Sequence, residues 1–410
     1  MGPMAGPGAG WRWVAGVVLA GMVAVAACSS DGDDDDGGAA APAGSDEADN
    51  GGDPAATVPG DDWTVASPDD HDMDAAKLEQ ARDYAFAGGK NTQGVVVVHR
   101  GEIVAEWYAD DADQDSWAAS WSMAKSFTSA LIGIAIDDGL IESVDEPMST
   151  WYPDWADTDK ADITLKDVLQ MSSGLDWDED YDPSAVAESE IIQMVLGEQD
   201  ELAYAASRPA ENEPGTTWNY SSGDAMLLSG VLEQATGMSV AEYAEQELFG
   251  PLGIDQVEWW QDARGHTLTY CCLDTTSRGF ARFGLLYEQD GKWGDEQVVP
   301  AGWVEDSLEP AQDSDGIYGY QWWLYEPDGV PADMFAAQGH DGQFIYVIPS
   351  LDLVVVRNGT YVKDPGEPVA DPTLFEHYPS DGLVEGKGTS PPDEWDEGAF
   401  LRPIVESLGG

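Results

Sequence analysis

Ser122 and Lys125 are the two side chains whose types and spacing most directly suggest covalent chemistry. Of the eight lysines in the chain, only Lys125 has a serine three residues before it. Ser122 opens an apolar segment with helical periodicity, so Lys125, one turn later, lies on the same face and can point its ammonium at the serine hydroxyl. A serine becomes nucleophilic when a neighbour removes its proton, which a desolvated lysine or a lysine-tuned tyrosine can do. The alternative is an N-cap serine followed by a surface lysine.

Two other polar segments can supply the rest of a site. Tyr220 lies in the loop Trp218-Asn-Tyr-Ser-Ser222, directly before a predicted apolar helix, although such a tyrosine can also belong to a simple capped turn. The second segment is Gly339-His-Asp-Gly-Gln343, which enters a predicted strand; Gly342 would let a substrate approach the strand edge, where backbone N–H groups can bind an oxyanion. A triad of His340 and its aspartate neighbour with another serine is less favoured, because adjacent strand residues point to opposite faces.

These three segments together resemble the motifs of the serine β-lactamase and penicillin-binding superfamily. In that family S-x-x-K opens a helix, Y-x-N or Y-S-x lies on a loop, and K-T-G or H-x-G lies beside the site on a strand. The resemblance extends from about Asp74 to Val356, and it is closest to the branch of 6-aminohexanoate-dimer hydrolases and class C-like esterases. Further segments resemble recurrent parts of the family, namely Met171-Ser-Ser-Gly-Leu175, Pro251-Leu-Gly-Ile254 and Arg278-Gly-Phe-Ala-Arg-Phe-Gly284.

The resemblance implies a role for each catalytic residue. Ser122 would be the nucleophile, Lys125 the group that lowers its proton affinity, and Tyr220 the general base. The backbone N–H groups of Ser122 and Gln343 would form the oxyanion hole. No cofactor is implied.

Three residues of the implied substrate-binding set are Ser222, His340 and Gly342. Ser222 stands where many members have asparagine, and His340 stands where β-lactamases and carboxypeptidases usually have lysine. A permanent cation is thereby replaced by a group that is near neutral at pH 7. We therefore expect a hydrolase of small-molecule amides or esters, with a β-lactamase or D-alanyl-D-alanine carboxypeptidase as the alternative. A rival from another class is a non-catalytic binding or sensor lipoprotein with the same fold.

The elements around these motifs predict an α/β protein of the α+β type. Strands at both ends of the chain, with helices between them, indicate an antiparallel sheet flanked by helices plus an all-helical subdomain, in one domain over residues 63–410. Pro403 is tolerable only in the first turn of the last helix. The predicted helices are 73–87, 122–138, 164–171, 185–196, 224–236, 240–248 and 400–408; the predicted strands are 94–99 and 103–108, a hairpin, and 318–325, 343–348 and 353–357.

The N-terminus predicts export and anchoring. The apolar run at 14–27 follows the cation Arg12 and is shorter than the roughly 20 residues that span a bilayer, so residues 1–27 are predicted to be a signal peptide. Val25-Ala-Ala-Cys28 resembles a bacterial lipobox, which implies lipid on Cys28 and a place on the extracytoplasmic face of the cell membrane. An ordinary secretory signal and an uncleaved anchor are the alternatives. Residues 28–62 are predicted to be a disordered acidic tether.

The composition limits the kinds of molecule that the protein is expected to bind. With 79 acidic and 17 basic side chains the formal charge is −62, which nearly excludes nucleic-acid binding, while 42% hydrophobic residues suffice for a core. The alternating acids at 31–35 and 176–180 do not predict calcium loops, because Asp36 and Tyr181 occupy the glycine position, and no metal is expected. Cys271 and Cys272 are adjacent, and two partly buried free thiols are favoured over a vicinal disulfide. The oligomeric state is not predicted.

Overall fold

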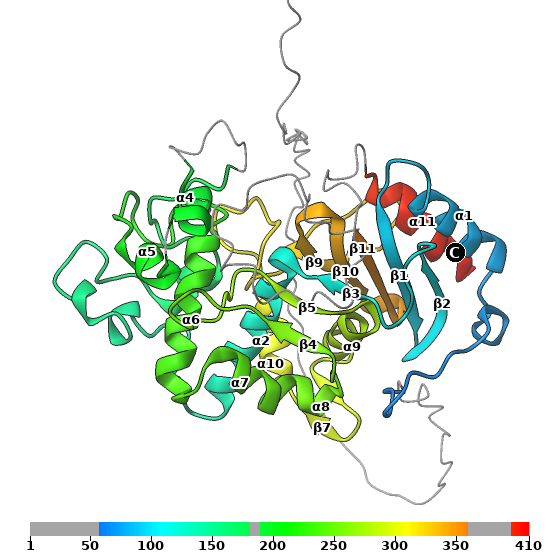
Figure 1. Cartoon of the computed structure of the whole chain (residues 1–410), viewed down its shortest axis with the longest axis horizontal. Helices are drawn as coiled ribbons and strands as arrows, with labels where there is room; N and C mark the ends of the chain where they lie inside the picture. Colours follow the sequence, from blue (N-terminus) through cyan, green and yellow to red (C-terminus); the bar gives the residue numbers. More distant parts are fainter. Residues whose placement is uncertain (1–56, 181–188, 198, 360–394, 410) are drawn as a thin grey trace, which may run out of the picture. The chain divides into compact units, whose positions relative to one another are not determined.

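The computed structural model describes residues 57–180, 189–197, 199–359 and 395–409 (Figure 1). The predicted signal peptide, its Cys28 and most of the predicted tether lie outside this part. Residues 57–62, the last of the predicted tether, are described. There the backbone carbonyls of Gly60 and Asp61 accept hydrogen bonds from the guanidinium of Arg282, at 2.9 and 3.2 Å.

The main sheet is antiparallel and combines strands from the N-terminal and C-terminal parts of the chain, as predicted. Its strand order is β2-β1-β11-β10-β9-β8. The hairpin of β1 and β2 is confirmed, whereas the strand predicted at 318–325 is limited to two residues. The bounds are β1 Thr92–His99, β2 Glu102–Tyr108, β8 Trp323–Leu324, β9 Phe335–Gly339, β10 Gln343–Ile348 and β11 Leu353–Gly359.

Helices cover both faces of this sheet, because its strands bury side chains on both sides. In β1, Val95 and Val97 belong to the cluster formed with α1 (Ala75–Ala85) and α11 (Glu397–Ser407), which lie side by side in Figure 1. Val96 and Val98 face the other way, toward α9 (Ser277–Glu288).

The prediction for Pro403 was wrong. The proline lies inside α11, which begins six residues before it, and not in the first turn. A proline there removes one backbone hydrogen bond. The buried side chains of Phe400, Leu401 and Ile404 anchor the helix on the sheet on both sides of the proline, which accounts for its tolerance.

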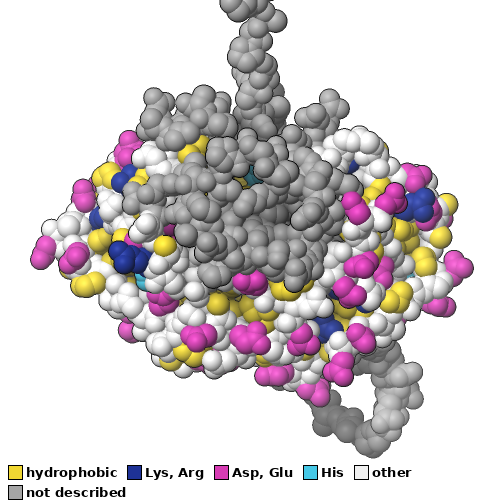
Figure 2. All heavy atoms as spheres, viewed as in Figure 1, with side chains coloured by type: hydrophobic (Ala, Val, Ile, Leu, Met, Phe, Trp, Pro, Cys, Tyr) yellow, Lys and Arg dark blue, Asp and Glu magenta, His cyan; other side chains and the backbone are white. Residues whose placement is uncertain are grey.

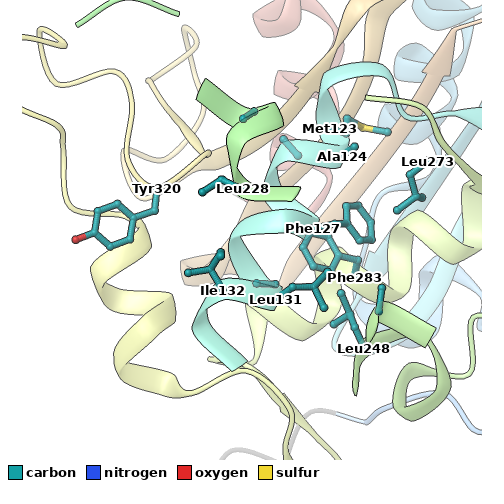
Figure 3. Close-up of a cluster of buried hydrophobic side chains, with 14 of the residues drawn as sticks. Met123, Ala124, Phe127, Leu131, Ile132, Leu228, Leu248, Leu273, Phe283 and Tyr320 are labelled. Carbon is teal, nitrogen blue, oxygen red and sulfur yellow. The ribbon is translucent and has the colours of Figure 1, made fainter. Parts of the chain in front are cut away.

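The remaining helices form the second part of the fold, around α2 (Ala124–Asp137) and α6 (Ser222–Thr236). Figure 3 shows α2 enclosed by apolar side chains, where Phe127 stacks on Phe283 with ring centroids 3.6 Å apart. No helix among the described residues is long and apolar enough to span a bilayer. The other elements are α3 Leu165–Leu169, α4 Glu190–Gly197, α5 Glu201–Ser207, α7 Val240–Ala244, α8 Gly250–Leu252, α10 Ala301–Ser307, the sheet β3 Trp117–Ala119, β5 Leu273–Thr276 and β4 Val257–Trp259, and the hairpin β6 Lys292–Trp293 and β7 Glu296–Gln297.

The fold class is thus confirmed as a mixed one, with an antiparallel sheet, flanking helices and a helical part. Figure 2 shows acidic side chains spread over the visible face, with fewer lysines and arginines. The acidity of the sequence therefore extends to the surface of the folded part.

Candidate active site

Ser122 lies at the start of a helix, as the sequence predicted. It is the middle residue of the 3-10 turn Trp121–Met123, which leads directly into α2. Trp121 has φ 46°, in the left-handed region, and such backbone strain is typical of functional sites. The end of β9 packs tightly here, because a Cβ at Gly339 would lie 2.2 Å from the carbonyl oxygen of Ser120. Ser122 itself is half-buried, so part of the residue is exposed.

Lys125 is buried, and three oxygen atoms lie within hydrogen-bond distance of its side-chain nitrogen. Its Nζ lies 3.0 Å from Ser122 Oγ, 3.0 Å from Ser222 Oγ and 2.9 Å from the carbonyl oxygen of Tyr270. Only 1% of the residue is exposed. Burial lowers the pKa of Lys125 to about 8, and the negative charge of Glu179 opposes this shift. A neutral amine is therefore accessible near physiological pH.

Tyr220 lies beside this ammonium in the loop before α6. The Lys125 Nζ is 5.0 Å from the centroid of its ring, which also stacks on Trp323 at 5.4 Å. Desolvation raises the pKa of Tyr220, and so does Glu179, while a hydrogen bond with Ser122 acts in the opposite direction. The phenol is therefore protonated near neutral pH, which suits it to donate a proton.

Ser222 links the lysine to a carboxylate that the sequence analysis did not identify. The Ser222 hydroxyl lies 2.5 Å from Glu179 Oε1, and its backbone N–H donates to Glu179 Oε2 at 2.9 Å. The indole of Trp177 donates to the same Oε2 at 2.5 Å. Glu179 is 43 residues away from Ser222 in the chain. Only its place among the acids of 176–180 could have drawn attention to it.

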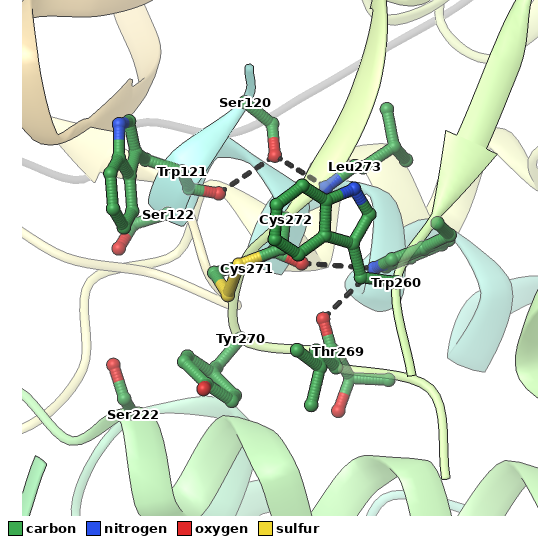
Figure 4. The surroundings of a disulfide bond; sticks show 12 residues. Ser120, Trp121, Ser122, Ser222, Trp260, Thr269, Tyr270, Cys271, Cys272 and Leu273 are labelled. Carbon is green, nitrogen blue, oxygen red and sulfur yellow. Dashed lines mark hydrogen bonds between the residues drawn. A yellow bond between two sulfur atoms is a disulfide. The ribbon is translucent and has the colours of Figure 1, made fainter. Parts of the chain in front are cut away.

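Cys271 and Cys272 form a vicinal disulfide, so the expectation of two free thiols was wrong. They occupy a tight turn between Tyr270 and β5 in which Cys272 has φ 66°, and this turn brings the two sulfurs together. Figure 4 shows the disulfide close to Ser122, Ser222 and Tyr270. The cysteine backbone is fixed as well, since the indole N–H of Trp259 donates to the Cys271 carbonyl at 3.0 Å. The disulfide thus immobilises the chain next to the carbonyl that binds Lys125.

His340 and Asp341 lie in a turn and not on a strand. The 3-10 turn His340–Gly342 joins β9 to β10, and His340 Nδ1 lies 2.9 Å from Asp341 Oδ1. The argument that these neighbours point to opposite faces was therefore wrong. The rings of His340 and Trp121 make an edge-to-face contact, with centroids 5.6 Å apart. This places the imidazole beside the residue that precedes Ser122.

The buried side chain of Arg357 holds this turn. It donates to the carbonyls of Asp341 at 3.1 Å and Gly342 at 2.5 Å, and Gly342 has φ 77°. Because a peptide unit is planar and trans, the N–H of Gln343 points away from the Gly342 carbonyl and hence away from Arg357. The Gln343 side chain is fully buried and accepts from Asn358 at 3.0 Å, so it takes part in the sheet. The role of the Gln343 N–H in an oxyanion hole stays a prediction.

Comparisons with known proteins identify the family and the fold. Residues 75–375 match the Beta-lactamase family. The 6-aminohexanoate-dimer hydrolase of Paenarthrobacter ureafaciens is 25% identical over 285 residues, which span 65% of this chain and 72% of that protein. Solved structures that share the fold include two hydrolases. A family VIII carboxylesterase has a TM-score of 0.56 at 17% identity, covering 74% of this chain and 97% of its own. A D-stereospecific amidohydrolase from Streptomyces sp. has a TM-score of 0.54 at 18% identity, covering 70% of this chain and 94% of its own.

Proposed function

Since the chain belongs to the β-lactamase family, we propose that it is a serine hydrolase that cleaves ester or amide bonds of small molecules through an acyl-enzyme on Ser122. The observation that carries this proposal is the environment of Lys125, which is buried and lies 3.0 Å from the Ser122 hydroxyl. A buried amine with a lowered pKa at this distance can remove the proton of a serine nucleophile.

Lys125 acts first, as the base. A neutral amine has two N–H groups and one lone pair. The Ser222 hydroxyl oxygen and the Tyr270 carbonyl accept the two N–H groups, which leaves the lone pair facing Ser122. The Ser122 proton moves to Lys125 as Oγ attacks the substrate carbonyl. This revises the interpretation from the sequence, which gave the first proton transfer to Tyr220.

Tyr220 acts second, as the acid. Its phenol donates a proton to the leaving oxygen or nitrogen as the scissile bond breaks, and the Lys125 ammonium returns a proton to the phenolate. Water then hydrolyses the acyl-enzyme by the same steps in reverse. The backbone N–H groups of Ser122 and Gln343 are the proposed donors to the oxyanion, worth about 3 kcal/mol each in transition-state stabilisation.

Covalent labelling tests the proposal. A fluorophosphonate probe should modify the protein, and peptide mapping should place the adduct on Ser122. Ser122→Ala should abolish labelling and hydrolysis with little change in melting temperature, because the residue is half-buried. Turnover retained in Ser122→Ala would refute the assignment. A wild type that resists the probe and hydrolyses no ester or amide would favour a non-catalytic binding protein.

We propose simple esters and linear amides as the preferred substrates over β-lactams. His340, which lies next to Trp121, takes the place of a permanent cation that would bind a β-lactam carboxylate. p-Nitrophenyl acetate or butyrate should therefore be hydrolysed measurably, and β-lactams weakly near neutral pH. His340→Lys should shift the ratio of kcat/KM toward β-lactams. A wild type that hydrolyses a cephalosporin much faster than every ester and linear amide would contradict this preference.

Anchoring by lipid on Cys28 remains a separate proposal. It is supported by the apolar run at 14–27 that ends in Val25-Ala-Ala-Cys28. The mature protein should fractionate with membranes, and Cys28→Ala should release it or leave an uncleaved precursor. Mass spectrometry that finds an unmodified mature N-terminus beyond Cys28 would refute the proposal.

A further inference from the structure

Glu179 determines which way the Ser222 hydroxyl points. An ionised carboxylate accepts hydrogen bonds and donates none, so across the 2.5 Å between Glu179 Oε1 and Ser222 Oγ the hydrogen belongs to the serine. The hydroxyl has only this one hydrogen. Toward Lys125, 3.0 Å away, Ser222 can therefore present only lone pairs.

This matters because Ser222 is the one ambiguous neighbour of the amine. Of the three groups that contact Lys125 Nζ, the Tyr270 carbonyl can only accept, and Ser122 must donate if it is to lose its proton. A serine hydroxyl can do either. If Ser222 donated its hydrogen to the lone pair of a neutral Lys125, it would compete directly with Ser122.

We propose that Glu179 is a positioning residue which, by accepting the hydrogen of Ser222, keeps the lone pair of Lys125 directed at Ser122. The inference rests on the proposed function, since it concerns the base of that reaction. It adds a residue outside the three motifs to the machinery of the site.

The contacts of Glu179 predict what an amide would do in its place. Oε2 accepts two N–H groups, from the Ser222 backbone and the Trp177 indole, and Oε1 accepts the Ser222 hydroxyl. In Glu179→Gln the amide oxygen would therefore occupy the Oε2 position, and its NH2 group would face the hydroxyl. The hydroxyl of Ser222 would then have to accept, and its hydrogen would turn toward Lys125.

The charge of Glu179 has a second effect that can be measured separately. Burial lowers the pKa of Lys125, and the charge of Glu179 partly offsets this effect by raising it. Removing the charge of Glu179 therefore lowers the pKa of Lys125 further. A variant that lacks the charge should have more neutral lysine and yet react more slowly. Among the described residues, the titratable groups around the amine and the carboxylate include Tyr220 and Tyr318, whose pKa values Glu179 also raises. They also include Tyr270, which bonds Glu201, and Asp224 beside Tyr318.

The experiment compares pH profiles of labelling by the fluorophosphonate probe and of p-nitrophenyl acetate hydrolysis. In Glu179→Gln the plateau of both should fall about tenfold or more, the usual value of a hydrogen bond to a charged group. The rising limb of the pH profile, where the rate increases with pH, should move to lower pH by about one unit. Asp178→Asn, which removes the neighbouring exposed charge, is the matched control and should keep the wild-type limb and plateau.

Ser222→Ala tests the same relay without altering the carboxylate. It should lower the plateau by no more than Glu179→Gln does, because no hydroxyl hydrogen can then compete for the lone pair of Lys125. Glu179→Gln should add no further loss to it, because the hydroxyl that the carboxylate orients is gone. Additive losses in the double variant would overturn the proposal. So would a Glu179→Gln plateau loss without a shift of the limb, an unchanged profile, or an equal shift in Asp178→Asn. A wild type that neither labels nor hydrolyses would instead refute the proposed function itself.

Discussion

The lowered pKa of Lys125 predicts a steep pH dependence of acylation. With a pKa of about 8 in place of the ordinary 10.5, roughly a tenth of the lysine is neutral at pH 7, against about 0.03% of an ordinary lysine. The environment of the site thus increases the neutral form about 300-fold at this pH. Because the neutral form falls to about 1% at pH 6, kcat/KM should rise nearly a hundredfold from pH 6 to the plateau above pH 9.

The assay is kcat/KM for p-nitrophenyl butyrate, corrected for spontaneous hydrolysis, between pH 6 and about 9.5, together with the rate of Ser122 labelling. The matched variant is Lys125→Arg. A guanidinium donates hydrogen bonds but stays protonated over this range, so the variant should lose the activity and the limb together. Agreement between the hydrolysis and labelling profiles would place the titrating group in the free enzyme.

Two results would refute the reasoning. A rate that falls as pH rises through 8 would mean that the ammonium form of Lys125 is required, and the first proton transfer would return to Tyr220. A rate that is flat between pH 6 and 9 would mean that neither group titrates as the structure indicates. Retained activity in Lys125→Arg would exclude a lysine base in the same way.

Three further predictions concern stability. Glu201 is fully buried and bonds the Tyr270 hydroxyl at 2.7 Å, and burial raises its pKa from 4.5 to about 8. Because the folded state binds this proton more tightly than the unfolded state, the contribution of Glu201 to stability falls as pH rises from about 4.5 to 8. The melting temperature of Glu201→Gln should therefore rise relative to that of wild type over this pH range. A constant difference between the two melting temperatures would contradict this. Residues 77–410 hold 64 acidic and 16 basic side chains, so the excess acidic side chains repel one another at low salt. The melting temperature should therefore rise as sodium chloride is raised from about 0.01 to 1 M, because the Debye length shortens from about 30 to 3 Å. An unchanged melting temperature would mean that the charges are already compensated. Phe283→Ala should lower the free energy of unfolding by about 3–5 kcal/mol in urea titrations, because it removes a fully buried ring stacked on Phe127 and Trp322. A loss below about 1 kcal/mol would mean that the surrounding side chains fill the cavity left by the ring.

The sequence predicted those parts of the fold that depend on local patterns. The hairpin of β1 and β2 followed from two β-rich runs separated by Arg100-Gly101, both of which have positive φ. The pair Ser122 and Lys125 followed from one helical turn. Because both signals are complete within a few residues, tertiary structure did not alter them.

Two of the features that the sequence analysis missed depend on contacts between distant segments, and a third depends on a local backbone conformation. β9 was not predicted, because its Phe-Ala-Ala-Gln-Gly sequence has a weak strand pattern and is fixed by pairing with β10. The disulfide needed the left-handed turn at Cys272, which the sequence does not reveal. Glu179 became visible only when the fold brought it to Ser222. For β9 and Glu179 the missing information was a long-range position, and for the disulfide it was the backbone conformation of one residue.

The electrostatics of the site explain how one buried pocket can support two opposite proton transfers. Desolvation favours the neutral form of every group, so it lowers the pKa of Lys125 and raises that of Tyr220. Burial thus makes the amine a base and keeps the phenol an acid, with no need for a second cation. Glu179 opposes the first shift and reinforces the second, so its charge limits how much lysine is neutral. The Ser222 hydroxyl that this carboxylate orients is the group through which it can favour the base in spite of its charge.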